Sequence, residues 1–512
     1  MSRPSAPDVD IAIVGAGFAG IGMAIRLRQA GHRDFVVLER AGELGGTWRD
    51  NTYPGCACDV QSHLYSFSFA PNPNWSQLYS PQPEILAYLK GCAARYGVMP
   101  HLRFRHLVQE ATWDENAGFW RLETSQGPLT ARVLVAGQGP LSEPAIPKIP
   151  GLEDFAGAQF HSARWDHDFD LAGKRVAVVG TGASAIQFVP AIQPMVAQLH
   201  VFQRTPPWVL PRFDRPVTPI EQWLFQALPA SQAIVRTAFY LYRELYVLGF
   251  RNPQIMALVE GAVRHHLARQ VPDPVLRAKL TPDYAMGCKR ILLSNDYLPA
   301  LTRPNVEVVV EGIERIDRRG VVTSDGVLRE VDAIIFGTGF QVTEQPFARH
   351  VRGRGGQTLA AAWGGSPVAY RGTTVSGFPN LFLLFGPNTG LGHSSVLLML
   401  ERQFDHVLDT LAAMRRRAAV AIEPTETAQA DYVAELDKMM EGTVWVSAGC
   451  MSWYLDPTGR NSTLWPGLVT SFERMMARFD PSAYHFVPPP GGTGAAGAEG
   501  GDAVGAAPRP AG

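Results

Sequence analysis

Three glycines near the N-terminus have the spacing of a turn that binds the pyrophosphate of a dinucleotide. Gly15, Gly17 and Gly20 follow an apolar run that ends at Val14, and an amphipathic stretch follows them. In a G-x-G-x-x-G turn the first glycine permits the tight bend, the second lets the backbone approach the pyrophosphate, and the third lets helix and strand pack closely. Glu39 ends the next apolar run and can accept hydrogen bonds from ribose hydroxyls, which favours FAD. The alternative is a glycine-rich turn of another α/β fold.

A second turn of the same kind predicts a second dinucleotide. It contains Gly180, Gly182, Ser184 and, in place of the third glycine, Ala185. The apolar run after it ends without an acidic residue, at Arg204 and Thr205. A cation beside a hydroxyl suits a 2′-phosphate, so this turn favours NADPH over NADH. The alternative for Arg204 is an ordinary exposed surface cation.

The elements around the two turns predict an α/β fold with two Rossmann-like dinucleotide-binding domains. Each turn lies in a strand, turn, helix, strand order, which is the order that a Rossmann half requires. From about residue 218 to residue 285 the pattern becomes helical and has no nucleotide-type glycine turn, which predicts a helical insert in the NADP domain. Within it, the aromatic-rich segment 239–250 predicts a packed helix rather than a helix at a membrane interface.

Domain boundaries follow from these pattern changes. We expect an FAD-binding domain in two parts, an NADP-binding domain in two parts, the insert and a tail: residues 1–150 (FAD, first part), 151–212 (NADP, first part), 213–285 (helical insert), 286–339 (NADP, second part), 340–487 (FAD, second part, with a C-terminal lid loop) and 488–512 (disordered tail). The tail is Pro, Gly and Ala with almost nothing to bury.

A longer pattern lies between the two glycine turns. Phe155, Gly157, His161, Trp165 and Asp166 fit F-x-G-x(3)-H-x(3)-W-[P/D]. Placed midway between two dinucleotide turns, this pattern resembles that of the type I Baeyer–Villiger monooxygenases. These are flavoenzymes that insert one oxygen atom of O2 beside a ketone carbonyl.

Residues 45–59 carry a second pattern of that family, G-G-x-W-x(4)-[F/Y]-P-G-x(3)-D. The resemblance implies that Thr47 and Trp48 cover the flavin and that Asp59 belongs to the active site. Without the resemblance, an Asp in such a stretch is more often a capping or turn residue.

Two later stretches extend the resemblance. In the stretch that ends Lys289-Arg290, the resemblance implies that Arg290 is the catalytic arginine and that Lys289 gives a second contact to the NADP phosphate. A Lys-Arg pair by itself usually marks a solvated face. Residues 452–456 resemble the mobile loop that closes over nicotinamide, with Trp453 as the lid residue, and ordinary aromatic packing is the alternative.

The resemblance implies an NADPH- and O2-dependent flavoprotein monooxygenase that converts ketones to esters or lactones through a C4a-peroxyflavin. In that mechanism Arg290 stabilises developing negative charge, Asp59 holds Arg290 in place, and His161 and Trp165 couple cofactor movement to catalysis. One alternative is a flavin monooxygenase that oxidises nitrogen or sulfur, and the Trp165-Asp166 ending and the Asp59/Arg290 pair argue against it. The other is a non-catalytic flavin-binding protein, against which the intact motifs argue.

Composition limits the partners and the location. The formal net charge of -1 implies neither nucleic acid nor an anionic membrane surface, and no apolar stretch reaches the ~20 residues of a spanning helix. The five cysteines are few and odd in number, which fits a reducing, cytoplasmic location without a disulfide framework. Cys56 and Cys58, with His63 nearby, lack the further ligands of a zinc site, so we expect no metal. The expected partners are a small ketone and O2; the sequence predicts neither which ketone nor the oligomeric state.

Overall fold

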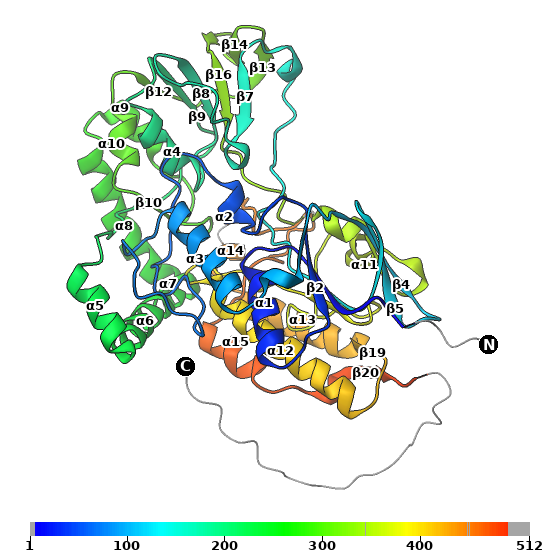
Figure 1. Cartoon of the computed structure of the whole chain (residues 1–512). Coiled ribbons are helices and arrows are strands. Elements are labelled where there is room, and N and C mark those ends of the chain that lie inside the picture. The colour runs from blue at the N-terminus through cyan, green and yellow to red at the C-terminus, as the bar shows by residue number, and fades with distance from the viewer. Residues whose placement is uncertain (1–5, 344, 448, 450, 490–512) are drawn as a thin grey trace.

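The two largest β-sheets, with a group of helices beside the smaller of them, dominate the computed structural model of the chain (Figure 1). The structure describes residues 6–343, 345–447, 449 and 451–489. The larger sheet has the strand order β17-β4-β5-β6-β1-β2-β3, and β18 also pairs with β6. Its strands are β1 (Val9–Val14), β2 (Phe35–Glu39), β3 (Leu102–Phe104), β4 (Val108–Asp114), β5 (Phe119–Thr124), β6 (Gly127–Ala136), β17 (Val351–Arg352) and β18 (Leu381–Leu383).

The first strand shows why the N-terminal apolar run forms the centre of this sheet. Strand β1 pairs in parallel with β2 and with β6, and Ile13 lies opposite Val37 on one side and Val135 on the other. Ile13 belongs to the core on one face of the sheet, while Ala12 and Val14 belong to the core on the other. A strand buried on both faces has to be apolar throughout.

Helices close one face of the larger sheet. Helix α1 (Phe18–Gln29) follows β1 through the first glycine turn and packs against α12 (Val396–Arg416), which in turn packs against α15 (Val469–Met476). Figure 1 shows these three helices together below the sheet. The Ser395 hydroxyl accepts from the Leu397 amide and caps the start of α12.

The smaller sheet is parallel throughout, with the order β12-β9-β8-β16-β7. Its strands and flanking helices are β7 (Ala158–His161), β8 (Arg175–Val179), β9 (Gln198–Phe202), β12 (Val306–Val309), β16 (Ala333–Phe336), α4 (Ala185–Ile192) and α10 (Tyr297–Leu301). The strands come from both sides of the helical region in the sequence, so the helices between them form an insert. A three-stranded antiparallel sheet follows, formed by β13 (Ile313–Asp317), β14 (Gly320–Thr323) and β15 (Leu328–Glu330).

The helical insert consists of α5 (Pro219–Ala227), α6 (Pro229–Glu244), α7 (Tyr246–Arg251), α8 (Pro253–Gln270) and α9 (Pro274–Leu280). Four of the five helices begin with a proline. The N–H groups of a first helical turn have no partner within the helix, so a proline, which lacks an N–H, costs nothing there. Thr218 and Glu221 add a capping box at the start of α5. The region predicted to be helical is therefore helical, and its starts are encoded locally.

The remaining elements connect these parts: α2 (Thr47–Asp50), α3 (Gln82–Arg95), α11 (Leu359–Trp363), α13 (Glu426–Met440), α14 (Val444–Ser447), β10 (Val209–Leu210), β11 (Leu292–Leu293), β19 (Ala421–Pro424), β20 (Tyr484–Val487), and the 3-10 turns Met99–His101, Leu152–Asp154, Ser162–Arg164, Pro346–Arg349, Arg354–Gly356 and Pro481–Ala483. The predicted tail lies outside the described residues from position 490 onward.

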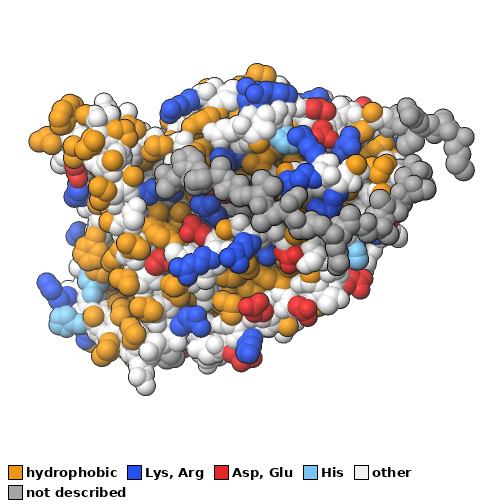
Figure 2. Space-filling view, turned by 90° about the horizontal axis from the view of Figure 1, so that it is seen from below, with side chains coloured by type: hydrophobic (Ala, Val, Ile, Leu, Met, Phe, Trp, Pro, Cys, Tyr) orange, Lys and Arg blue, Asp and Glu red, His pale blue; other side chains and the backbone are white. Residues whose placement is uncertain are grey.

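The prediction of one packed helix over 239–250 is wrong in part. The helix is interrupted at Leu245, between α6 and α7, and Leu241, Leu245 and Leu248 are each more than half exposed. Hydrophobic side chains gather on the side of the molecule that carries the insert (Figure 2). The charged residues Arg243 and Glu244 are buried, as are Val247 and Phe250. Periodicity missed this because it assigns charged residues to the solvent face.

The cysteines are mostly unpaired among the described residues. Cys56, Cys58 and Cys92 are free and buried, whereas Cys288 is disulfide-bonded. The sequence predicts no disulfide framework, and this one bonded cysteine does not amount to a framework. Among the described residues, no helix combines the length and the apolar character needed to cross a membrane.

Candidate active site

A cavity of about 1340 Å³ brings most of the predicted site residues together. The predicted residues that line it are Gly15, Gly17, Glu39, Thr47, Trp48, Asp59, Gly180, Gly182, Ser184, Arg204, Thr205, Lys289, Arg290 and Trp453. They come from both sheets, from the loop after α9 and from the C-terminal loop. Gly20 and the five residues of the motif at positions 155–166 do not line it.

The first glycine turn forms a backbone cradle at the start of α1. Gly15 has φ +98°, and a Cβ there would lie 2.8 Å from the carbonyl oxygen of Gly137. At Gly20 a Cβ would lie 1.8 Å from the Gly15 carbonyl oxygen, so helix and strand pack too closely for any side chain. At Gly17 the nearest atom is the Cα of Gly46, at 3.6 Å. Since Gly17 caps α1 without a side chain, the first amides of the helix face the cavity, as a pyrophosphate requires.

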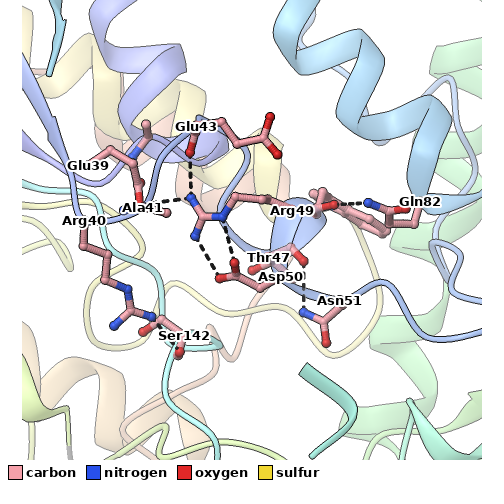
Figure 3. Close-up of polar contacts among 12 residues, drawn as sticks. Glu39, Arg40, Ala41, Glu43, Thr47, Arg49, Asp50, Asn51, Gln82 and Ser142 are labelled. Atoms are coloured by element: carbon pink, nitrogen blue, oxygen red, sulfur yellow. Dashed lines mark hydrogen bonds and ion pairs between the residues drawn. The ribbon is translucent and has the colours of Figure 1, made fainter. Parts of the chain in front are cut away.

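Glu39 stands at the end of β2 in a dense polar network (Figure 3). One carboxylate oxygen accepts from the Ala16 amide at 2.9 Å, and the other accepts from the Ala41 amide at 2.9 Å and from Arg49 at 3.0 Å. A carboxylate has about four acceptor positions, so roughly one remains for a ribose hydroxyl. The network fixes the carboxylate beside the cavity, and the cradle together with this acceptor fits the FAD predicted for it.

Thr47 and Trp48 begin the short helix α2 on the cavity wall. The Trp48 indole N–H donates to the Tyr65 hydroxyl at 3.0 Å, and Gln82 donates to the Trp48 carbonyl. The side-chain amide Nδ2 of Asn51 donates to the Thr47 carbonyl at 2.9 Å. Because these partners hold both residues, the predicted flavin contacts would meet a rigid surface.

The second glycine turn is built in the same way. Gly180 has φ +104°, and a Cβ there would lie 2.5 Å from the Gly337 carbonyl oxygen, whereas Gly182 meets its nearest atom only at 4.0 Å. Ser184 precedes α4 without capping it by its side chain. The Thr181 hydroxyl donates to the Thr205 carbonyl at 3.2 Å and ties the turn to the end of β9.

Two cations without carboxylate partners stand beside this turn. Among the described residues, neither Arg204 nor Lys289 forms an ion pair with a carboxylate. Burial and the charge of Arg204 lower the pKa of Lys289, which shows that the two positive groups lie close enough to interact. Lys289 Nζ also lies 4.7 Å from the ring centre of Tyr284. The charge of Asp283 raises the pKa of Lys289 in part, but among the described residues neither cation is ion-paired, and two such neighbouring cations fit a phosphate dianion.

Arg290 and Asp59 form an ion pair on the cavity wall. Arg290 Nε donates to Asp59 Oδ2 at 2.8 Å, Nη2 lies 2.6 Å from the same oxygen, and Nη1 donates to the Leu391 carbonyl at 3.4 Å. Burial raises the pKa of Asp59, but the charge and hydrogen bonds of Arg290, with the charge of Arg243, lower it more, and it lies below its ordinary value. The Asp59 charge in turn raises the pKa of Arg290. The pair therefore stays ionised at neutral pH.

Trp453 lies on the C-terminal loop and is 44% exposed, while its neighbour Tyr454 is buried. The hydroxyl of Tyr454 interacts with Arg290, and burial raises the pKa of Tyr454 to about 12, so the phenol stays protonated. Sequence reasoning singled out Trp453 in this stretch and missed Tyr454, whose role depends on the distant Arg290. Arg243, on α6, is a second missed residue: its guanidinium reaches Asp59 from the helical insert.

The motif at positions 155–166 runs along the edge strand β7 of the smaller sheet and does not line the cavity. His161 ends β7 opposite Phe336 of β16, and its Nδ1 accepts from the Ala163 amide at 3.1 Å. The Trp165 ring lies 6.5 Å from that of Tyr53 and 5.4 Å from that of Phe188, and so joins the 45–59 segment to α4.

The three other motif residues have local structural roles. Phe155 is buried in the core of the smaller sheet, and at Gly157 a Cβ would lie 2.4 Å from the Asp332 carbonyl oxygen. The Asp166 carboxylate accepts from the Asp168 amide at 3.0 Å and closes a turn. The predicted coupling function of the motif stays a prediction.

Known proteins with similar sequences and structures are dinucleotide-dependent oxidoreductases, in agreement with the two glycine turns of the site. The family described as pyridine nucleotide-disulphide oxidoreductase matches residues 12–238. A Baeyer–Villiger monooxygenase of Streptomyces coelicolor is 51% identical over 494 residues, which is 96% of this chain and 95% of that protein. A Baeyer–Villiger monooxygenase of Pseudomonas aeruginosa is 50% identical over 483 residues, 94% of this chain and 92% of that protein. The crystal structure of the OTEMO complex with FAD and NADP superposes with a TM-score of 0.86 at 27% identity, covering 94% of this chain and all of that one.

The chain belongs to the Baeyer–Villiger monooxygenases. The matches confirm the predicted fold with two dinucleotide-binding domains, the class of FAD-containing, NADPH-dependent monooxygenase and the two cofactors. They support the Baeyer–Villiger interpretation over the nitrogen- or sulfur-oxidising alternative and the non-catalytic one.

Proposed function

We propose that this chain inserts one oxygen atom of O2 beside the carbonyl of a small ketone, giving an ester or lactone, and that Arg290 and Asp59 are its catalytic pair. The observation that carries the proposal is their ion pair on the wall of the cavity that both glycine turns also line. Negative charge develops during the oxygenation, and a fixed cation beside the two dinucleotide sites can stabilise it.

Bound FAD, reduced by NADPH, supplies the activation of O2. The residues of the chain supply orientation and charge. Arg290 stabilises the negative charge that develops on the ketone oxygen when its carbonyl carbon is attacked, because a preorganised guanidinium needs no reorganisation at that moment. Asp59 keeps the guanidinium in place, since Arg290 uses its Nε and Nη2 edge for that contact.

The cofactor contacts are assigned by the same geometry. For FAD we assign the turn Gly15, Gly17 and Gly20, with Glu39 on the ribose and Thr47 and Trp48 over the flavin. For NADPH we assign the turn Gly180, Gly182 and Ser184, with Arg204, Thr205 and Lys289 on the 2′-phosphate and Trp453 as the lid. The support for the phosphate assignment is that two cations lie together and, among the described residues, neither forms an ion pair with a carboxylate.

The domain boundaries and the role of the 155–166 motif are also proposals. The FAD domain comprises residues 1–150 and 340–487 and the NADP domain residues 151–212 and 286–339, with the insert at 213–285 between the two NADP parts. His161 and Trp165 couple cofactor movement to catalysis, for which the support is the Trp165 contact between the 45–59 segment and α4. A cytoplasmic location stays a prediction.

A panel of linear, cyclic, aromatic and polycyclic ketones tests the function. With NADPH and O2, at least one ketone should give a product heavier by one oxygen, and NADPH consumption should rise when that ketone is added. The same panel should include sulfides and tertiary amines. Oxidation of these together with no reaction on any ketone would support the heteroatom alternative, and no turnover on any compound would support the non-catalytic one.

A further inference from the structure

Arg243 lies near the end of α6, in the helical insert, and it is 7% exposed. A buried guanidinium has to be satisfied by hydrogen bonds or by an opposite charge. Among the described residues Arg243 forms no ion pair with a carboxylate. Its partners are neutral oxygen atoms from two loops that lie far from it in the sequence.

The three hydrogen bonds of Arg243 go to two chain segments, 59–61 and 391–393. Its Nη2 donates to the Asp59 carbonyl at 3.0 Å and its Nε donates to the Gln61 side chain at 2.9 Å. Its Nη1 donates to the His393 carbonyl at 3.3 Å. Arg243 therefore bridges the segment 59–61 and the segment 391–393.

Arg290 bridges the same two segments from the cavity side. It holds the Asp59 carboxylate and donates to the Leu391 carbonyl. Asp59 is thus held twice: Arg290 binds its side chain and Arg243 binds its main chain. The segment 391–393 is likewise held by both guanidinium groups.

Glu244, the residue after Arg243, also holds the segment 391–393. Glu244 accepts from the His393 imidazole Nε2 at 3.3 Å and from the Val469 amide at 3.0 Å, at the start of α15. The end of α6 therefore holds His393 by its main chain and by its side chain. The insert is anchored to the site by these two adjacent buried charges.

We propose that Arg243 is a positioning residue for the oxygenation reaction: it fixes the main chain of Asp59 so that Asp59 can hold Arg290 in its working orientation. This proposal rests on the proposed role of the Asp59/Arg290 pair. Arg243 acts through Asp59 and needs no contact with ketone, flavin or nicotinamide. A misplacement of about 1 Å at a reacting group can cost roughly 100-fold in rate, so the contact is expected to matter.

The test is a double-mutant cycle in the full-length holoenzyme, with Arg243→Met, Asp59→Ala and the double variant. Arg243→Met keeps a long side chain but cannot donate hydrogen bonds. We expect it to lower kcat for ester formation roughly 10- to 100-fold, with flavin content and the KM for NADPH near those of the parent. In the Asp59→Ala background the same change should have little further effect, because the residue through which Arg243 acts is already altered. Arg243→Lys should restore part of the rate.

Arg236→Met is the matched control. Arg236 also lies on α6 and points inward, and its Nη1 donates to the backbone carbonyls of His63 and Ser66, away from Asp59. Its loss should lower the melting temperature, as in Arg243→Met, but leave kcat near the parent value. Equal kcat losses in the two variants, or losses of Arg243→Met and Asp59→Ala that multiply in the double variant, would overturn the proposal. Parent-like ester formation by Asp59→Ala would instead contradict the proposed role of the pair, and with it the route assigned to Arg243.

Discussion

Arg290 holds Asp59 by a single carboxylate oxygen: Nε and Nη2 lie 2.8 Å and 2.6 Å from Oδ2. This side-on contact uses one edge of the guanidinium, Nη1 makes a 3.4 Å contact with the Leu391 carbonyl, and the Tyr454 hydroxyl also interacts with Arg290. An arginine engaged in this way is fixed in orientation and still has donors to offer a ligand in the cavity. The chemistry assigned to the site depends on that combination.

Cofactor preference should depend on Arg204. Arg204→Ala should raise the KM for NADPH roughly 10- to 100-fold, the value of a charge-assisted hydrogen bond, and change the KM for NADH little, because only NADPH carries the 2′-phosphate. Steady-state kinetics with both cofactors measures this. Arg164→Ala is the control, since Arg164 is exposed and does not line the cavity. Equal losses with NADPH and NADH would contradict the assignment.

The two glycines that flank the start of α1 should respond differently to a methyl group. In Gly17→Ala the added carbon meets its nearest atom at 3.6 Å, so the protein should fold but bind FAD more weakly, because the methyl group occupies the approach of the pyrophosphate. In Gly20→Ala the carbon would lie 1.8 Å from the Gly15 carbonyl oxygen, so the chain should misfold. Circular dichroism and the flavin absorbance of the purified proteins distinguish these outcomes. A folded Gly20→Ala protein with full flavin content would be inconsistent with the packing.

The stability of the protein should fall in mild acid partly because of His161. Burial lowers the pKa of His161 to about 4, from about 6.5 in an unfolded chain. The unfolded state therefore binds the proton more strongly, and the stability that His161 contributes is complete above pH 6.5 and is lost as the pH falls from 6.5 to 4.

His161→Asn should make the free energy of unfolding less dependent on pH in that window. The Asn side-chain oxygen can replace Nδ1 as acceptor for the Ala163 amide but does not titrate. Urea unfolding at several pH values gives the slope. An unchanged slope would mean that His161 does not contribute to the acid sensitivity.

Trp453 should become less accessible when NADP⁺ binds, if its loop closes over the nicotinamide. Limited proteolysis with chymotrypsin should cut near this 44% exposed side chain more slowly after NADP⁺ is added. Cutting at Phe213, which is 76% exposed and does not line the cavity, should continue at the same rate and serves as the internal control. Equal rates of cutting near Trp453 with and without NADP⁺ would argue against a lid.

The parts of the fold that are encoded locally could be predicted from the sequence. The glycine turns, the proline-initiated helices of the insert and the apolar β1 each depend on neighbouring residues, and they lie where the sequence indicates. Arg243 could not be found in this way, because its contact with the Asp59 carbonyl spans 184 positions and a charged residue in an aromatic helix is ordinarily assigned to the surface. Tyr454 was missed for the same reason: its importance depends on Arg290, which only folding brings near.

The central claim is that Arg290 acts in oxygenation and not in cofactor binding, and Arg290→Ala tests it most directly. Its flavin content and its rate of flavin reduction by NADPH, measured by stopped-flow absorbance without O2, should stay near the parent values. Ester formation from the best ketone should fall roughly 10²–10³-fold, the cost of removing one preorganised electrostatic partner. Arg290→Lys should recover little, because an ammonium cannot bind Asp59 and keep further planar donors free. An Arg290→Ala enzyme that forms ester at near the parent rate would contradict the account.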